Sequence, residues 1–158
     1  MLALGQVDWA MNWRPSFIVA ALLALLPAVA VSATDPVVGY WFTENNRAIV
    51  QIVPCGNSVC GRMVWLKEPL DETGQPKIGA AGQPLCGYSL AEGFSRSSNG
   101  QWDDGNIRNP RNGKRYSALL RIKQDGRLEV RGYAGISLFG SSQLWSRARG
   151  DMGGCPIH

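Results

Sequence analysis

The stretch GYWFTENNRAIVQIVPCGNSVCGRMVWL, residues 39–66, decides the fold class of this chain. Within it, residues 48–52 (AIVQI) carry apolar side chains at every second position, a period typical of a β-strand with one buried face. Pro54 is expected to end this strand. Similar short segments at 38–43 and 60–66 flank it, and in the latter both faces are apolar. The stretch therefore predicts three consecutive short strands.

A cysteine-bracketed turn separates the second of these strands from the third. Residues 56–59 (GNSV) have the composition of a chain reversal, which brings Cys55 and Cys60 together. Of the three possible pairings of the four cysteines, we favour Cys55–Cys60 because it closes the shortest loop, leaving Cys86 with Cys155. A zinc site with four cysteine ligands is the alternative, but such sites usually contain paired C-x-x-C motifs.

The first 33 residues have the features of an export signal. Arg14 precedes an apolar run from Phe17 to Val31, and residues 31–33 (VSA) are small, as a signal peptidase requires. The run is shorter than the ~20 apolar residues of a membrane-spanning helix and contains Pro27. We therefore expect residues 1–33 to be a removed signal peptide, with no transmembrane segment after cleavage.

Cleavage after Ala33 would leave residues 34–158 as a single domain, located in the periplasm or secreted. Met11 is an alternative start, because a charged leader follows it directly. The net charge of +4 comes from basic residues interleaved with acidic ones. Nucleic-acid binders instead show clustered basic stripes, so nucleic acid is not an expected partner.

The sequence shows no set of catalytic residues. The only histidine is His158, the last residue, which argues against a histidine-dependent triad and against a histidine-rich metal site. Asp103 and Asp104 are adjacent, so on a strand they would point to opposite faces and would not flank one bond. We expect turn acids at these positions, and we expect neither a cofactor, a metal ion nor catalysis.

The rest of the chain continues the strand pattern. In residues 114–123, Tyr116 and the apolar residues at 118, 120 and 122 share one face. Asp125-Gly126 predicts a two-residue hairpin with a type I′ turn. The later strands are predicted at 85–94, 101–108, 114–123, 127–133 and 142–147.

Residues 67–84 form the longest segment without a strand pattern. Their prolines and glycines exclude a continuous helix or strand, and we favour an ordinary surface loop over a functional lid. The chain thus contains eight predicted strands with short connections. Closure would remove both exposed sheet edges, so we expect an antiparallel up-and-down β-barrel, with a two-sheet sandwich as the alternative.

The order of short motifs resembles the bacterial domain-of-unknown-function family 2147. The resemblance is carried by Gly39-Tyr40-Trp41, Thr43-Glu44, Cys60-Gly61-Arg62, Trp65, Pro84-Leu85, Gly87, Trp102, Gly105, Ile107, Pro110, Gly113-Lys114, Tyr116, Leu128, Arg131-Gly132-Tyr133, Trp145 and Arg147. It implies an exported protein with a lipocalin-like (calycin) barrel and no settled activity. In the wider superfamily, Trp41 and Arg147 would form a structural pair that closes the barrel through a cation–π contact.

A barrel of this size holds either packed side chains or one small ligand. We expect a small, partly apolar molecule, lined by Trp65, Tyr116 and Tyr133 and anchored by Arg62 and Arg131. The alternative is a solid-cored module that contacts a cell-wall partner or an anionic lipid of the envelope. A basic cluster around the turn signals at 109–113 suits such a partner, although a solvated hairpin tip is the simpler interpretation; the cluster comprises Arg108, Arg111, Lys114 and Arg115.

Overall fold

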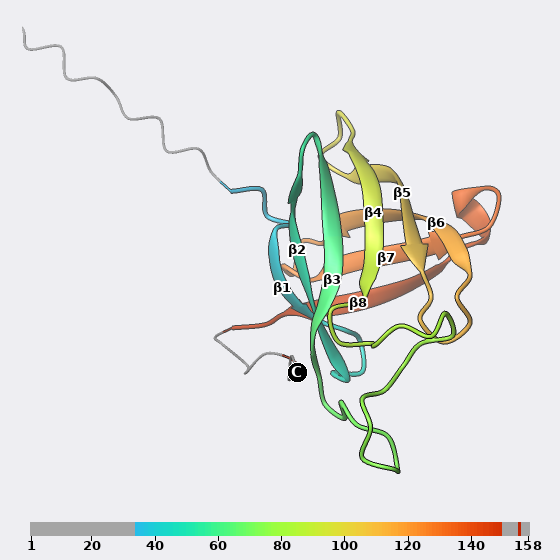
Figure 1. The fold of residues 1–158 in the computed structure, drawn as a ribbon. Coiled ribbons are helices and arrows are strands. Elements are labelled where there is room, and N and C mark those ends of the chain that lie inside the picture. The colour runs from blue at the N-terminus through green and yellow to red at the C-terminus, as the bar shows by residue number, and fades with distance from the viewer. Residues whose placement is uncertain (1–33, 150–154, 156–158) are drawn as a thin grey trace, which may run out of the picture. The chain divides into compact units, whose positions relative to one another are not determined.

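The computed structural model describes residues 34–149 and 155, and its strands close into one antiparallel barrel (Figure 1). The predicted signal peptide, residues 1–33, lies outside the described residues. The strands are β1 (Gly39–Phe42), β2 (Ala48–Cys55), β3 (Ser58–Leu66), β4 (Ser89–Arg96), β5 (Trp102–Arg108), β6 (Arg115–Ile122), β7 (Leu128–Tyr133) and β8 (Ser141–Arg147). Between β7 and β8 lies one turn of 3-10 helix, η1 (Ser137–Phe139).

Each strand pairs with its neighbours in sequence, and β8 returns to pair with β1 at Trp41–Arg147 and Phe42–Ser146. The predicted up-and-down barrel is therefore confirmed, and the sandwich is not formed. No helix in the described part of the chain is both long and apolar enough to cross a bilayer.

One half of the barrel interior is filled with side chains. Trp41, Phe94 and Leu128 are fully buried there, because alternate residues of each strand point inward. Trp102 joins this packing, and its Nε1 donates a hydrogen bond to Asp35 from the segment before β1. That end of the barrel is closed by the chain itself.

The Trp41–Arg147 pair expected from the resemblance lies at this closed end. The Arg147 guanidinium carbon is 3.9 Å from the centre of the Trp41 ring, and Arg147 donates hydrogen bonds to the carbonyls of Pro36 and Val38. Gly39 makes room for it: φ is +132° there, and a Cβ would stand 2.5 Å from an Arg147 nitrogen. The close approach of Arg147 thus explains why a glycine stands two residues before Trp41.

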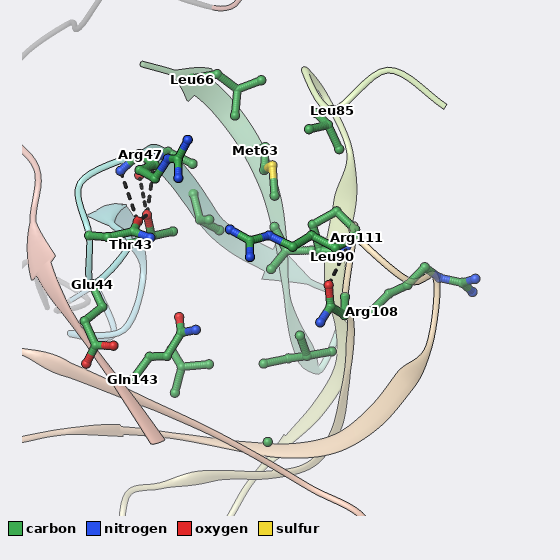
Figure 2. Close-up of a pocket in the computed structure, with 18 of the residues that line it drawn as sticks. Thr43, Glu44, Arg47, Met63, Leu66, Leu85, Leu90, Arg108, Arg111 and Gln143 are labelled. Carbon is green, nitrogen blue, oxygen red and sulfur yellow. Dashed lines mark hydrogen bonds between the residues drawn. The ribbon is translucent and has the colours of Figure 1, made fainter. Parts of the chain in front are cut away.

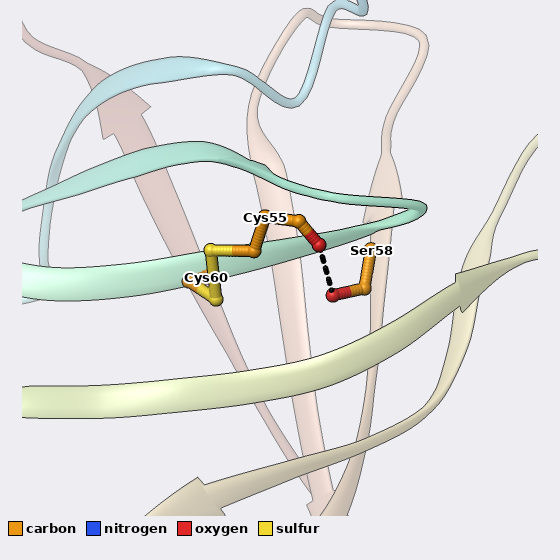
Figure 3. The surroundings of a disulfide bond; sticks show 3 residues. All are labelled: Cys55, Ser58 and Cys60. Atoms are coloured by element: carbon orange, nitrogen blue, oxygen red, sulfur yellow. Dashed lines mark hydrogen bonds between the residues drawn. A yellow bond between two sulfur atoms is a disulfide. The ribbon is translucent and has the colours of Figure 1, made fainter.

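Both predicted disulfides are formed. The hairpin disulfide, Cys55–Cys60, joins β2 and β3 beside their connecting turn, where the Ser58 hydroxyl donates to the Cys55 carbonyl (Figure 3). The long-range disulfide joins Cys86 to Cys155, whose N–H donates to the β3 backbone. Two disulfides fit an oxidising environment outside the cytoplasm.

Three local predictions need correction. Asp103 and Asp104 do not lie in a turn but within β5, at an irregularity of its pairing with β6. Pro54 does not end β2, which continues to Cys55; a proline is tolerated near a strand end beside a turn. The Asp125-Gly126 turn is not type I′, because only Gly126 has a positive φ. The Lys123 N–H bonds the Arg127 carbonyl and the Gly126 N–H bonds the Lys123 carbonyl, so the loop has three residues and ends in a left-handed glycine.

Candidate functional site

The other end of the barrel contains a cavity of about 750 Å³ that is open to solvent. In an up-and-down barrel, alternate connections lie at the same end. The mouth is accordingly formed by the connections β1–β2, β3–β4, β5–β6 and β7–β8, each of which adjoins or supplies lining residues. The interior is thus packed with side chains at one end and has a cavity open to solvent at the other.

The wall of the cavity is mainly apolar. It is built mainly from inward-facing strand residues, where alternation continues the core toward solvent, together with Leu85 of the β3–β4 connection. These side chains are Ala48, Val50, Met63, Leu66, Leu85, Leu90, Ile107, Val130 and Trp145. A molecule that enters would therefore exchange water for hydrocarbon contacts.

The rim of the cavity is polar and carries more basic than acidic side chains. Its cations are Arg47, Lys77, Arg108 and Arg111, and its acids are Glu44 and Glu68. Within residues 34–149 and 155, no group of three or more His, Cys, Asp or Glu side chains is placed to hold a metal ion. The rim is therefore suited to contact with an anionic group.

Glu68 is already paired with two of the rim cations. Its Oε2 lies 3.1 Å from the Lys77 nitrogen and 3.6 Å from an Arg47 nitrogen. The hydrogen bond from Lys77, followed by the charges of Lys77 and Arg47, lowers the pKa of Glu68 below its ordinary value. Glu44 instead accepts a hydrogen bond from the Leu144 N–H.

Arg111 has no carboxylate partner among the described residues. Its backbone N–H is held by the Asn109 side chain, which fixes the tip of the β5–β6 connection. Figure 2 shows the Arg111 guanidinium pointing in among the lining residues, whereas that of Arg108 points away from them. Arg111 is thus a cation placed over an apolar cavity and free to pair with something that enters it.

The long β3–β4 connection covers part of the mouth. Glu68, Lys77, Ile78, Ala80 and Leu85 of this segment all line the cavity. The segment is braced across the opening, because the Ala80 N–H donates to the Pro110 carbonyl of the β5–β6 connection at 2.9 Å. The interpretation of residues 67–84 as an ordinary surface loop is therefore replaced by that of a loop that shapes the site.

Of the five residues predicted to contact a ligand, Tyr116 is the one that lines the cavity. It lies on β6, is half-buried, and its hydroxyl is 3.5 Å from the Asn112 side-chain nitrogen. The other four, Arg62, Trp65, Arg131 and Tyr133, are not among the lining residues.

A β-bulge in β3 explains the position of Trp65. Ile49 pairs with Trp65 but Val50 pairs with Met63, so Val64 is an extra residue that shifts the alternation. Met63 therefore faces the cavity, while Trp65 packs edge-on against Phe42 on the outer surface, with ring centres 6.0 Å apart. Strict alternation had assigned both residues to the same face.

Arg62 also belongs to the outer surface. It follows Gly61, whose missing Cβ would point to Val50 and Ile52 in the interior, so the Arg62 side chain points the other way. There Arg62 donates to Gln51, and Gln51 donates to the Tyr40 hydroxyl. Arg62 is thus part of a polar row across β1, β2 and β3.

Arg131 and Tyr133 alternate with the cavity-lining residues Val130 and Gly132, so they face outward from β7. Arg131 donates to the carbonyls of Ser137 and Leu138 and to the Ser142 hydroxyl. Its position is that of a support for the β7–β8 connection rather than of an anchor inside the barrel.

Most of the apolar residues that line the cavity were not predicted from the sequence. A usable signal was present: once an up-and-down barrel is assumed, inward positions beside the first, third, fifth and seventh connections must surround one mouth. This rule would have selected Ala48, Ile107 and Val130, whereas our prediction favoured aromatic and basic residues without placing them at an end of the barrel.

Comparisons with known proteins support the fold. A bacterial family model described as an uncharacterised protein conserved in bacteria (DUF2147) matches residues 39–147. Among solved structures, the chain is similar to protein HP1028 from Helicobacter pylori, described as belonging to the lipocalin family, with a TM-score of 0.55 and 13% identity over 70% of this chain and 82% of that one. No curated protein matches the chain. At this identity the structural likeness concerns the lipocalin-like fold alone.

Proposed function

Since this chain belongs to the uncharacterised bacterial family DUF2147, we propose its function from the cavity itself: the barrel binds a small molecule with an apolar body and an anionic group. The observation that carries this proposal is an apolar hollow with one inward-pointing arginine at its mouth. A fold alone does not establish a function, so the argument rests on these residues.

The apolar body of the ligand would occupy the hollow half of the barrel. A volume of about 750 Å³ lies within the ~300–1,000 Å³ of ordinary small-molecule sites. Leu66, Leu85 and Ile107, which are only partly buried, would contact it, and Tyr116 would add an aromatic face with a hydroxyl near the rim. Burial of apolar surface would supply most of the affinity.

The anionic group of the ligand would lie at the rim beside Arg111. Arginine binds carboxylate and phosphate groups well because its planar guanidinium offers several donors in a fixed geometry. Arg47 and Lys77 are already paired with Glu68, whereas Arg111 has no carboxylate partner among the described residues. An incoming anion would therefore form its strongest new interaction with Arg111.

A cavity-filling substitution tests the proposal directly. Gly132 lines the cavity, and a Cβ there would meet only the Tyr116 Cβ, at 3.9 Å, so the Gly132→Leu side chain would enter open space. We expect binding of N-phenyl-1-naphthylamine, a neutral apolar fluorophore, to weaken by about tenfold or more, because the new side chain occupies the ligand's volume.

The matched control is Ser117→Leu, which adds the same side chain to the outer face of β6, on the strand beside Gly132. This variant should bind the fluorophore as the wild type does. Equal binding by both variants, with both folded by circular dichroism, would remove the cavity as the binding site.

The alternative function, a solid-cored module that contacts an envelope partner, does not have the core that it requires. The hollow half is larger than the ~300 Å³ at which ordinary ligand sites begin. Contact with a lipid surface does not depend on a solid core, however, and the mouth of the barrel offers separate grounds for it.

A further inference from the structure

The η1 turn displays large apolar side chains to solvent. Ile136, Leu138 and Phe139 are 60%, 75% and 78% exposed, although residues of these types are usually buried. All three belong to one short segment between β7 and β8, which projects from the barrel in Figure 1, so they are not scattered singly over the barrel wall. A concentrated apolar tip of this kind usually marks a contact surface.

The tip is held in place by a hydrogen-bonded support. Arg131 binds the carbonyls of Ser137 and Leu138, at 2.9 and 3.1 Å, and the Ser142 hydroxyl at 2.9 Å. Ser142 in turn donates to the buried carboxylate of Glu129. Because the turn backbone is tied to β7 and β8 in this way, its apolar side chains are kept pointing outward instead of folding back onto the barrel.

Basic side chains are carried by a connection at the same end of the barrel as this tip. Ser117 of β6 pairs with Tyr133 of β7, so the β5–β6 connection, which precedes β6, and the turn after β7 extend from adjoining strands. Arg111 and Lys114 of that connection are exposed and have no carboxylate partner in the described part of the chain. Arg115 is paired with Glu92 at 2.9 Å. The cavity mouth lies beside both connections, since Gly132 and Ser141 line it.

We propose that the η1 turn inserts Ile136, Leu138 and Phe139 into the surface of an anionic lipid bilayer, with the positive charges of Arg111 and Lys114 attracting its head groups. Apolar side chains flanked by cations are the combination that binds an anionic membrane interface, because burial of hydrocarbon and attraction to head groups act together. Docking of this kind sets the mouth of the cavity against the lipid. The inference goes beyond the proposed function and does not depend on a ligand being bound.

A bilayer fits this surface better than a second copy of the chain. Specific protein interfaces bury roughly 800 Å² on each partner, far more than three side chains on one short turn supply. Two copies meeting at this tip would also bring their Arg111 and Lys114 residues together, and like charges oppose such contact. Neither rim acid is paired with Arg111 or Lys114: Glu68 is paired with Arg47 and Lys77, and Glu44 accepts a hydrogen bond from the Leu144 N–H.

Flotation with lipid vesicles tests the proposal. Wild-type protein is mixed with vesicles of phosphatidylcholine alone, or with vesicles in which phosphatidylglycerol replaces a third of it. We expect binding to the anionic vesicles, weakened by high NaCl. The double variant Leu138→Ser/Phe139→Ser should lose about tenfold or more in partition coefficient, since two side chains no longer bury apolar surface. Arg111→Gln/Lys114→Gln should lose the preference for anionic vesicles.

Leu70→Ser is the matched control for the tip variant. Leu70 is also an exposed apolar residue, at 45%, but it lies in the β3–β4 connection, where it bridges to Pro76, and not between β7 and β8. Flotation of this variant should equal that of the wild type. Loss of binding in Leu70→Ser to the same degree as in the tip variant would overturn the proposal, because apolar exposure in general would then be responsible.

Two further outcomes would also overturn it. The first is equal flotation of the wild type and the folded tip variant. The second is a wild-type dimer, detected by analytical ultracentrifugation without lipid, that the tip variant abolishes, since a second copy would then occupy the surface. Fluorophore binding in lipid-free solution should be unchanged in the tip variant, which separates a failure of this proposal from a failure of the cavity.

Discussion

Replacing Arg111 with glutamine should weaken binding of an anionic amphiphile and leave binding of a neutral one unchanged. The matched pair of probes is 1-anilinonaphthalene-8-sulfonate, which carries a sulfonate, and N-phenyl-1-naphthylamine, which has a similar aromatic body and no charge. Both fluoresce on entering an apolar site, so one titration format gives both dissociation constants.

The expected magnitude follows from the position of Arg111. A hydrogen bond to a charged group contributes roughly 1.5–3 kcal/mol net, and Arg111 is exposed, so we take the lower end. A loss of about 1.5 kcal/mol corresponds to an approximately tenfold rise in the dissociation constant of the anionic probe. The neutral probe should change by less than about twofold, because the apolar wall is untouched.

Lys114→Gln is the control for this prediction. It removes the same charge from the same connection, but Lys114 does not line the cavity. At physiological salt its effect on the anionic probe should be less than about twofold, since exposed charges beyond roughly 8 Å are screened. Equal weakening of anionic-probe binding by both variants would show that the overall electrostatic field of the connection is responsible. Unchanged binding of this probe to Arg111→Gln would show that its sulfonate lies elsewhere.

Three further predictions concern the supports of the site. Glu129→Gln should lower the free energy of unfolding by about 1–3 kcal/mol at neutral pH. Burial raises the pKa of Glu129, but hydrogen bonds from Arg121 and Ser142 outweigh this effect, so its pKa in the folded protein is lowered. The stability difference between wild type and variant should therefore be present above the ordinary pKa of a glutamate and disappear as the pH falls below the lowered pKa. Urea titrations at neutral and acid pH measure this difference. Gly39→Ala should lower stability by about 1–3 kcal/mol, because alanine is strained at this positive φ and its Cβ meets Arg147, and an unchanged Tm would refute this account. Removing the long-range disulfide should cost about 4 kcal/mol and removing the hairpin disulfide about 2, since the closed loops differ in length; the opposite order in urea unfolding of the two cysteine-to-alanine pairs would contradict this.

Alternation predicted most strands correctly where it was regular. In β6, Ala118 and Leu120 face the interior together with Tyr116, as the pattern indicated. It failed at β3, where the extra residue Val64 moves Trp65 to the outer surface. A bulge is specified by the partner strand as much as by the bulged one, so the sequence of β3 alone does not reveal it.

The site was harder to predict than the fold. Arg111 belonged to a basic cluster visible in the sequence, but nothing local distinguished it from Lys114, which does not line the cavity. Arg131 was predicted as a ligand anchor, yet its bonds go to the backbone of the η1 turn. The role of a long polar side chain depends on which groups the fold brings within its reach.

From the sequence alone we predicted the strand pattern, the cysteine pairing favoured by loop length, and a closed barrel in preference to a two-sheet sandwich. The strand pattern and the turn between Cys55 and Cys60 are local properties, because two-residue periodicity and turn composition act between near neighbours in the chain, whereas closure brings the first strand to the last. The sequence did not reveal that one end of the interior is packed while the other forms a cavity, or that Arg111 points in over this cavity. The physical reason is that a cavity is the space left when residues from distant strands meet, and its size depends on bulges, strand register and loop bracing together.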